Sequence, residues 1–372
     1  MTQKQSEIQQ VSDIQDFLFE ITTDNLQEHI DQMNQKFDLH DKNTLRHVLA
    51  SSGIVFHIRP SVQKSLIQLL LSISSIVQSQ FTPHELYYIF CLDLSNYFLY
   101  ELISNKILTF PSIFSIPHNE NPEFLSYFAP ELETYDITKF NEIKTSLEFE
   151  LDKHEELRSN GVNHSEIAKI IREDQIDLFI EFISRSESEV NGQIPDSIFE
   201  GCHYLKSKPS FIEYAAFFGS VQIFQHILNQ NVQLTNGVTS YAVMGGNLNI
   251  IHLCQEHHLN FDNAIDTALI FHRNDVLNYF LDNSYAFTNY SPLACIEGYN
   301  YSYFYQLFND NCDKNRLINN CSDTPLIYST KHLYPEFAVF ISSLSGVDFN
   351  RVDDILISRI LILFYTQHFH GI

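Results

Sequence analysis

The chain has 372 residues, a length that suits two or three ordinary domains or one elongated repeat array. Apolar residues make up 44% of the chain, which is enough for a sizeable core and argues against wholesale disorder. The formal net charge of −24 argues against binding to nucleic-acid phosphates or to anionic lipid headgroups.

Neither end of the sequence has the features of an export signal or a membrane anchor. The first ten residues are polar, and the apolar runs at 66–77 and 355–365 are shorter than the roughly 20 residues that span a bilayer. No two cysteines form a CxxC pair. We therefore expect a soluble cytoplasmic protein with reduced thiols and no membrane contact. The cysteines are Cys91, Cys202, Cys254, Cys295, Cys312 and Cys321.

The first 160 residues are predicted to be helical, but their topology is not evident from the sequence. Apolar residues recur with helical spacing over 11–21 and 26–37, and the strongly apolar stretch 86–108 suggests a helix pair. Its inward-facing residues are expected to be Cys91, Tyr97, Phe98 and Leu102. Three prolines predict a connection near 109–123, and residues 142–158 read as a charged helix. We expect a helical N-terminal region over 1–122 and a helical connection over 123–160.

The second half of the chain contains an internal repeat. Its clearest copy has a small residue at Ala215, a glycine four positions later at Gly219, and an apolar pair at 223–224. The same landmarks recur from Ala242 at a spacing of 27 residues and from Ala268 at a spacing of 26. A looser copy begins at Ala294, with one residue inserted before its apolar pair. An earlier copy surrounds Asp174, and a final one runs over 323–350.

This pattern predicts tandem helix hairpins. The small residue allows close backbone approach, and a residue that tolerates left-handed geometry ends the first helix, as expected for Gly219, Gly246 and Gly298. The second helix packs back through its apolar stripe, and each hairpin must stack on the next to bury its faces. We predict an all-α fold, with a helix-pair solenoid over 161–372 that ends in a C-terminal capping helix.

Two motifs give this array a family resemblance. The sequence Thr324-Pro325-Leu326, followed by Ser-Gly-Val-Asp-Phe-Asn at 345–350, resembles the ankyrin repeat signature. The copies around Gly219, Gly246 and His272 are similar to short-loop ankyrin-repeat proteins of an expanded family in parabasalid protists, which carry a domain of unknown function. The resemblance implies an ankyrin-like stack that binds proteins. The missing residues fall where the β-hairpin finger would be, so finger-mediated binding is expected only near Asp348.

Within an ankyrin stack, the two residues before each helix-ending glycine line the concave groove. The middle of this row is apolar and its ends are charged, as a protein-binding surface requires. The charged ends are Arg172 and Glu173 on one side, and Glu297, Lys331 and His332 on the other. The predicted partner-binding residues are Phe217, Phe218, Met244, Ile270, Phe271 and Ile296. The alternative is that shortened loops bury these side chains in the core.

We expect a non-catalytic adaptor or scaffold that binds an unidentified protein, with no catalytic site, no metal and no cofactor. One alternative is a metal- or thiol-dependent enzyme that uses the His/Cys cluster at 252–258, although the cluster lacks CxxC or HExxH spacing. Its cysteine, Cys254, falls in the inward stripe, where a structural role is favoured. A second alternative is an architectural protein that self-associates through its N-terminal helices.

Overall fold

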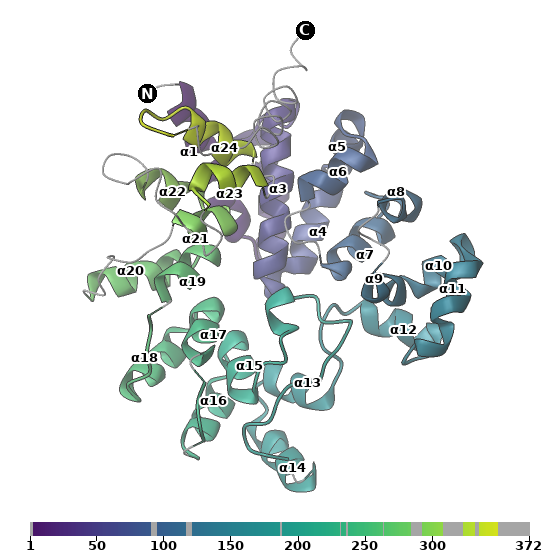
Figure 1. Cartoon of the computed structure of the whole chain (residues 1–372), viewed down its shortest axis with the longest axis vertical. Helices are drawn as coiled ribbons and strands as arrows, with labels where there is room; N and C mark the ends of the chain where they lie inside the picture. Colours follow the sequence, from purple (N-terminus) through teal and green to yellow (C-terminus); the bar gives the residue numbers. More distant parts are fainter. Residues whose placement is uncertain are drawn as a thin grey trace. The chain divides into compact units, whose positions relative to one another are not determined.

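The computed structural model describes residues 3–90, 95–116, 121–186, 188–230, 232–235, 237–262, 264–283, 292–307, 323–331 and 335–348. Regular structure within these ranges is helical, apart from one isolated β-bridge between Gln193 and Ser210 (Figure 1). The prediction of an all-α, repeat-like fold is therefore confirmed. The chain divides into two compact units, residues 13–260 and residues 1–12 with 261–372. The predicted boundaries at 122 and 160 stay a prediction.

The first part of the larger unit is a sequence of short helices around one apolar core. Phe98 lies at its centre, stacked on Phe56 at 4.3 Å between ring centroids and edge-on to Phe90 at 5.2 Å. The helices are the part of α1 (Gln3–Phe19) from residue 13 on, α2 (Leu26–Lys36), α3 (Lys42–Ile58), η1 (Pro60–Val62), α4 (Gln63–Ser72), α5 (Ser74–Gln80), α6 (Pro83–Phe90), α7 (Asn96–Ser104), α8 (Phe110–Phe114), α9 (Pro122–Tyr127), α10 (Ala129–Tyr135), α11 (Ile137–Ile143), η3 (Lys144–Ser146) and α12 (Leu151–Arg158). The helix pair predicted over 86–108 corresponds to α6 and α7, and Tyr97, Phe98 and Leu102 are buried as expected. Cys91 lies outside the described residues.

Two expectations for this region were wrong. The predicted connection at 109–123 contains α8 and the start of α9, because Pro111 and Pro122 stand in the first turns of these helices. A proline is tolerated there, since the first amide groups of a helix have no intrahelical acceptor. The single charged helix predicted over 142–158 is also interrupted: α11 ends at Ile143, and α12 begins only at Leu151.

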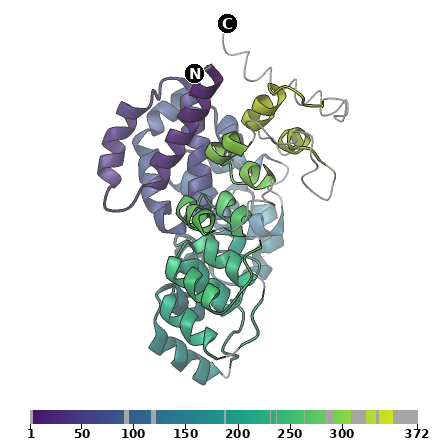
Figure 2. The same cartoon turned by 90° about the vertical axis from the view of Figure 1, so that its left-hand side faces the viewer.

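Three helix pairs complete the larger unit: α13 (Glu166–Arg172) with α14 (Ile176–Ser186), α15 (Phe211–Phe218) with α16 (Val221–Leu228), and α17 (Gly237–Gly245) with α18 (Leu248–Glu256). First helices pack on first helices, α13 on α15 and α15 on α17, while α14, α16 and α18 form a second row. The turned view shows the pairs lying one above another (Figure 2). This is the series of stacked hairpins that the repeat predicts.

The smaller unit contains three further pairs: α19 (Ala264–Ile270) with α20 (Asn274–Asp282), α21 (Pro292–Glu297) with α22 (Tyr301–Leu307), and α23 (Pro325–Lys331) with α24 (Pro335–Ser342). Here too the first helices pack in order, α19 on α21 and α21 on α23. The predicted capping helix after residue 350 lies outside the described residues, as do Cys312 and Cys321.

A residue in the left-handed conformation separates the two helices of each of the first five pairs. Asp174, His272 and Tyr299 adopt this conformation without being glycine, and asparagine, aspartate and histidine are the L-residues most enriched in it. The five residues are Asp174, Gly219, Gly246, His272 and Tyr299, with φ of 48°, 75°, 75°, 46° and 55°. The predicted turn geometry is therefore confirmed at Gly219 and Gly246.

The register predicted for the fifth pair was wrong by one residue. Tyr299, not Gly298, has the left-handed backbone, so the small residue of this copy is Cys295 rather than Ala294 and no residue is inserted. Gly298 is small for another reason. A Cβ there would lie 2.6 Å from the Ile270 Cα and 2.8 Å from the Ile270 carbonyl oxygen. Gly298 therefore permits close approach of α21 to α19.

Hydrogen bonds between the interhelix turns connect successive repeats. The buried Ser220 hydroxyl donates to the carbonyl oxygen of Ile171 at 2.5 Å, and Asn300 Nδ2 donates to the Leu269 carbonyl oxygen at 3.0 Å. Each bond runs from the residue after a left-handed position to the first helix of the preceding repeat. The turns therefore satisfy carbonyl groups at helix ends that have no intrahelical partner.

Candidate partner-binding surface

The predicted binding row lies where the first helices of the repeats end. In the second pair, Ser210 and Glu213 form a capping box at the start of α15, and Gly219 ends the helix. The end of α17 lies directly beside it: a Cβ on Gly245 would be 2.5 Å from the carbonyl oxygen of Ala216. Residues at these two helix ends, Phe218 and Met244 among them, therefore belong to neighbouring positions on one side of the stack.

The structure buries half of the predicted binding residues. Phe217 is 7% exposed, Phe271 is 1% exposed and Ile296 is 0% exposed, so these three serve the core and cannot contact a partner in this structure. Close packing of first helices, as at Gly245, leaves no open groove at these positions. Phe218, Met244 and Ile270 are half-buried and keep part of their surface accessible. The rings of Tyr214 and Phe217 support Phe218, with centroids at 4.8 and 5.1 Å.

The charged ends of the row form internal contacts. Arg172 Nη1 donates to the Tyr214 hydroxyl at 2.8 Å and to the carbonyl oxygen of Asn163 at 2.9 Å. At the other end, Lys331 Nζ pairs with Asp323 at 2.5 Å, and Glu297 accepts a hydrogen bond from the Tyr328 hydroxyl at 3.0 Å. Glu173 is exposed, and His332 lies outside the described residues.

A buried carboxylate that the sequence did not reveal lies behind this row. Glu200 is 4% exposed and accepts hydrogen bonds from the amides of Cys202 at 3.2 Å and Asn163 at 3.3 Å. The Tyr214 hydroxyl also donates to it at 3.4 Å. Burial raises the pKa of Glu200 and outweighs these hydrogen bonds. The contacts hold the segment between α14 and α15 against both helix pairs.

The segment between α14 and α15 begins after Ser186, the last residue of α14. The rest of the segment includes the short helix η4 (His203–Leu205), and its end is held by main-chain bonds such as Ile194 N to Pro209 O at 2.9 Å. No local pattern could have indicated Glu200, because its partners Asn163 and Tyr214 lie far from it in sequence.

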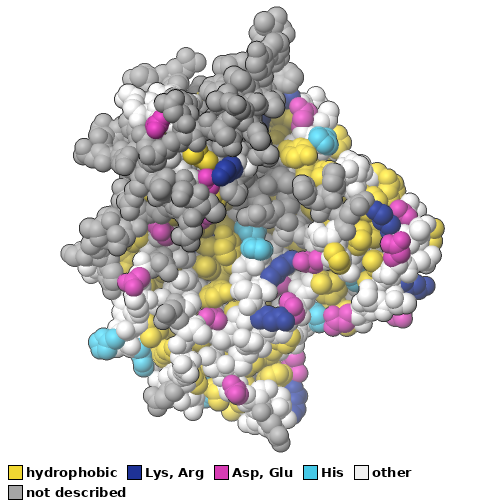
Figure 3. Space-filling model, viewed as in Figure 1, with side chains coloured by type: hydrophobic (Ala, Val, Ile, Leu, Met, Phe, Trp, Pro, Cys, Tyr) yellow, Lys and Arg dark blue, Asp and Glu magenta, His cyan; other side chains and the backbone are white. Residues whose placement is uncertain are grey.

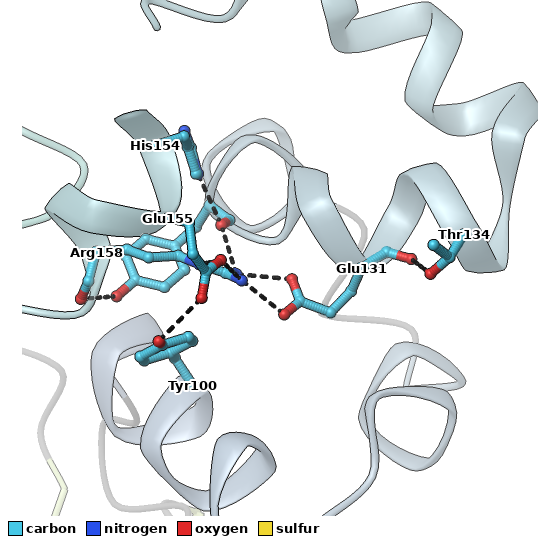
Figure 4. A network of polar contacts seen from close by, with 7 residues as sticks. Tyr100, Glu131, Thr134, His154, Glu155 and Arg158 are labelled. Atoms are coloured by element: carbon cyan, nitrogen blue, oxygen red, sulfur yellow. Dashed lines mark hydrogen bonds and ion pairs between the residues drawn. The ribbon is translucent and has the colours of Figure 1, made fainter. Parts of the chain in front are cut away.

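A second buried network centres on Arg158, which is 2% exposed (Figure 4). Its two terminal nitrogens donate to both oxygens of Glu131 at 2.7 and 2.8 Å, and its Nε donates to Glu155 at 2.7 Å. The Tyr100 hydroxyl donates to the other oxygen of Glu155 at 3.1 Å. Burial disfavours the charge on Arg158, but Glu131 and Glu155 outweigh it and raise the pKa of the guanidinium. The network joins α7, α10 and α12 and has a structural role.

The His/Cys cluster at 252–258 does not converge on one point. Cys254 is buried in the inward stripe of α18, whereas His252, His257 and His258 are exposed. Burial raises the pKa of the Cys254 thiol to about 12, which suppresses the reactive thiolate. Among the described residues, no group of three or more histidine, cysteine or acidic side chains has the arrangement of a metal site.

The described residues also contain no helix with the length and apolar character needed to cross a bilayer. On the face shown in Figure 3, apolar and acidic side chains are interspersed over the described surface. On this face, the described surface therefore has small apolar areas with charged neighbours.

Comparison with known proteins identifies one domain. The family described as "Domain of unknown function (DUF3447)" matches residues 228–307, which run from the end of α16 to the end of α22. Neither the curated proteins nor the solved structures provide a significant match to the chain. A DUF3447 domain is thus found within the repeat array.

Proposed function

We propose that this chain is an ankyrin-type scaffold that binds a protein partner at the ends of its first helices. The ankyrin assignment is supported by three successive helix pairs in each unit and by the left-handed residue between the helices of five of these pairs. The Thr324-Pro325-Leu326 motif lies at the start of α23, where an ankyrin signature would place it. As part of the same proposal, the chain is related to the short-loop ankyrin proteins of parabasalid protists and is located in the cytoplasm.

One observation carries the binding proposal. Phe218 and Met244 lie at the ends of adjacent first helices of the same unit, and both remain half-buried although the residues before them, Phe217 and Val243, are buried. Phe218 rests on the rings of Tyr214 and Phe217, so its position is set before any partner arrives. Rigid, partly exposed aromatic side chains are favoured as anchors in protein interfaces because little side-chain entropy is lost on binding. Fold by itself does not determine function, and this surface is what connects the stack to binding.

The proposal can be tested by capture with the full-length chain as bait. Proteins retained from cells that express it would be identified by mass spectrometry, purified and titrated against the chain. We expect the F218S/M244S double variant to weaken binding at least about tenfold, which corresponds to about 1.4 kcal/mol. Its helical circular dichroism should not change.

Leu248→Ser is the matched control, because Leu248 is an exposed apolar residue on the second row of helices. It should bind the partner as the unmodified chain does. The proposal fails if no protein is reproducibly retained, or if the double variant and the L248S variant bind equally well.

A further inference from the structure

The helix α14, the first of the second row in the described repeats, has an apolar side that the described residues leave partly exposed. Leu178 stands four residues after the left-handed Asp174, as Ile223 stands after Gly219 and Ile250 after Gly246. Ile223 and Ile250 are both 0% exposed, whereas Leu178 is 46% exposed. The same holds one turn later, where Phe182 is half-buried but its equivalents Ile227 and Cys254 are buried.

The packing of α16 explains this difference. The ring of Phe179 on α14 lies 6.0 Å from the ring of His226, so α16 turns its His226 side toward the preceding helix. Ile223 lies three residues before His226 and shares that side. The equivalent residues of α14 are Glu181 and Leu178. They therefore lie on the side where a preceding second-row helix would pack, and α14 is the first helix of that row.

The stack itself indicates what would cover this side. Within the same unit, the equivalent side of α16 is covered by α14, and that of α18 by α16. The occupant of the Leu178 side is therefore a helix with an apolar stripe, which continues an interface that the fold already repeats.

Charge determines which kind of helix fits. Asp177 and Glu181 stand one turn apart beside Leu178 and Phe182, and both are exposed. The nearby Arg185 pairs with both oxygens of Glu166 at 2.8 Å, and its guanidinium lies over the Phe182 ring at 5.8 Å from the ring centroid. Arg185 and Glu166 offset each other, so Asp177 and Glu181 keep the border of the apolar strip negatively charged. A second copy would bring the same acidic border and the same net charge of −24. A helix with lysine or arginine beside its apolar stripe is complementary instead.

We propose that the Leu178 side of α14 binds a basic amphipathic helix of another protein, which extends the second row by one helix. This inference rests on the proposed scaffold function and adds a second binding surface with a partner of defined chemistry. Apolar contact at Leu178 and Phe182 supplies affinity, and Asp177 and Glu181 select for basic residues.

Fluorescence anisotropy with two labelled peptides and the full-length chain tests this proposal. Each peptide has about 18 residues, long enough to form a helix, with leucine on one face and either lysine or glutamate on the other. We expect the Leu/Lys peptide to bind and the Leu/Glu peptide to bind at least about tenfold more weakly. Leu178→Gln should weaken binding of the Leu/Lys peptide at least about tenfold. D177N/E181Q should weaken it and reduce its dependence on salt.

Ile180→Gln is the matched control, because Ile180 is 44% exposed on the opposite flank of the same helix. It should change the affinity by less than about twofold. The inference is overturned if I180Q weakens binding as much as L178Q, if both peptides bind equally, or if the Leu/Lys peptide does not bind. It is also overturned if sedimentation reveals a homodimer that L178Q dissociates, because a second copy would then be the occupant.

The two proposals fail separately. If F218S/M244S abolishes peptide binding and L178Q does not, the peptide occupies the ends of the first helices; the α14 inference then falls and the scaffold proposal stands. If the capture experiment with the full-length chain retains no protein, the scaffold proposal falls whatever the peptides do.

Discussion

The carboxylate of Asp174 accepts hydrogen bonds from the backbone amides of Gln222 and Ile223 at 3.0 and 2.9 Å. Asp174 belongs to the turn of the first helix pair, whereas Gln222 and Ile223 open the second helix of the next pair. One residue therefore forms the turn of its own hairpin with a left-handed backbone, and its side chain caps a helix in the neighbouring repeat. Coupling between repeats is built into the turn that defines each repeat.

Substitution of Asp174 should separate these two roles. Asp174→Ala removes the cap and places a less tolerant residue at φ 48°, so we expect a loss of about 1–2 kcal/mol in the free energy of unfolding. Asp174→Asn keeps a side-chain acceptor for the α16 amides and tolerates the left-handed backbone. Asp174→Gly tolerates the left-handed backbone but has no side chain to cap α16. Urea denaturation should rank the variants Asn, Gly and Ala in order of decreasing stability. If Ala equals Asn, the contact to α16 contributes nothing.

Arg158 provides a test of the N-terminal region. Arg158→Ala should lower the free energy of unfolding by about 3 kcal/mol or more, because it leaves the Glu131 carboxylate without its bidentate partner in a largely buried site. Arg158→Lys keeps the charge but not the planar fork, so its loss should be smaller. Both would be measured by urea denaturation followed by circular dichroism.

Lys153→Ala is the control on the same helix, because Lys153 forms an exposed pair with Glu156. Its denaturation midpoint should equal that of the unmodified chain. Equal midpoints for the Arg158 and Lys153 alanine variants would show that the network does not stabilise the fold.

The sequence predicted the repeats well because their landmarks are local. A small residue, a turn residue and an apolar pair lie within ten positions of one another, and helix periodicity connects them. The error at Ala294 has a physical cause. The prediction interprets Gly298 as the residue with left-handed backbone geometry. In the structure Gly298 is required for the close approach of two helices, and Tyr299 has the left-handed backbone. These two uses of glycine cannot be distinguished from one sequence.

The candidate surface was harder to predict. The sequence identified the ends of the first helices in the second to fourth pairs but not in the fifth. It also could not show that Phe217, Phe271 and Ile296 pack inward while Phe218 and Met244 remain partly accessible. Burial at those positions depends on how closely neighbouring first helices approach. Leu178 matches the apolar stripe of the other repeats in sequence, so the sequence does not indicate its exposure, which arises because no described helix precedes α14 in the second row.

The buried Glu200 predicts a pH dependence of stability. Burial raises its pKa above the ordinary value of 4.5, so the folded chain retains this proton at a pH where the unfolded chain has lost it. The stabilising contribution is complete below pH 4.5 and is lost as pH rises through the folded-state pKa. The side chain of Glu200→Gln does not titrate in this pH range. The stability of the unmodified chain relative to E200Q should therefore decrease as pH rises from 4.5 toward neutrality, measured by urea denaturation at several pH values. A constant difference would mean that Glu200 is not desolvated.

Cys254 tests the remaining alternative, a thiol-dependent enzyme. Its thiol is buried in α18, and burial raises its pKa to about 12, so the thiolate population near neutral pH is very small. Alkylation with iodoacetamide followed by peptide mass spectrometry should leave Cys254 unmodified in the folded chain and modify it fully in urea. Cys254→Ser should place a hydroxyl in an apolar site and destabilise the fold by about 1–3 kcal/mol. Rapid alkylation of Cys254 in the folded chain would contradict a structural role and restore the case for a reactive thiol in this helix.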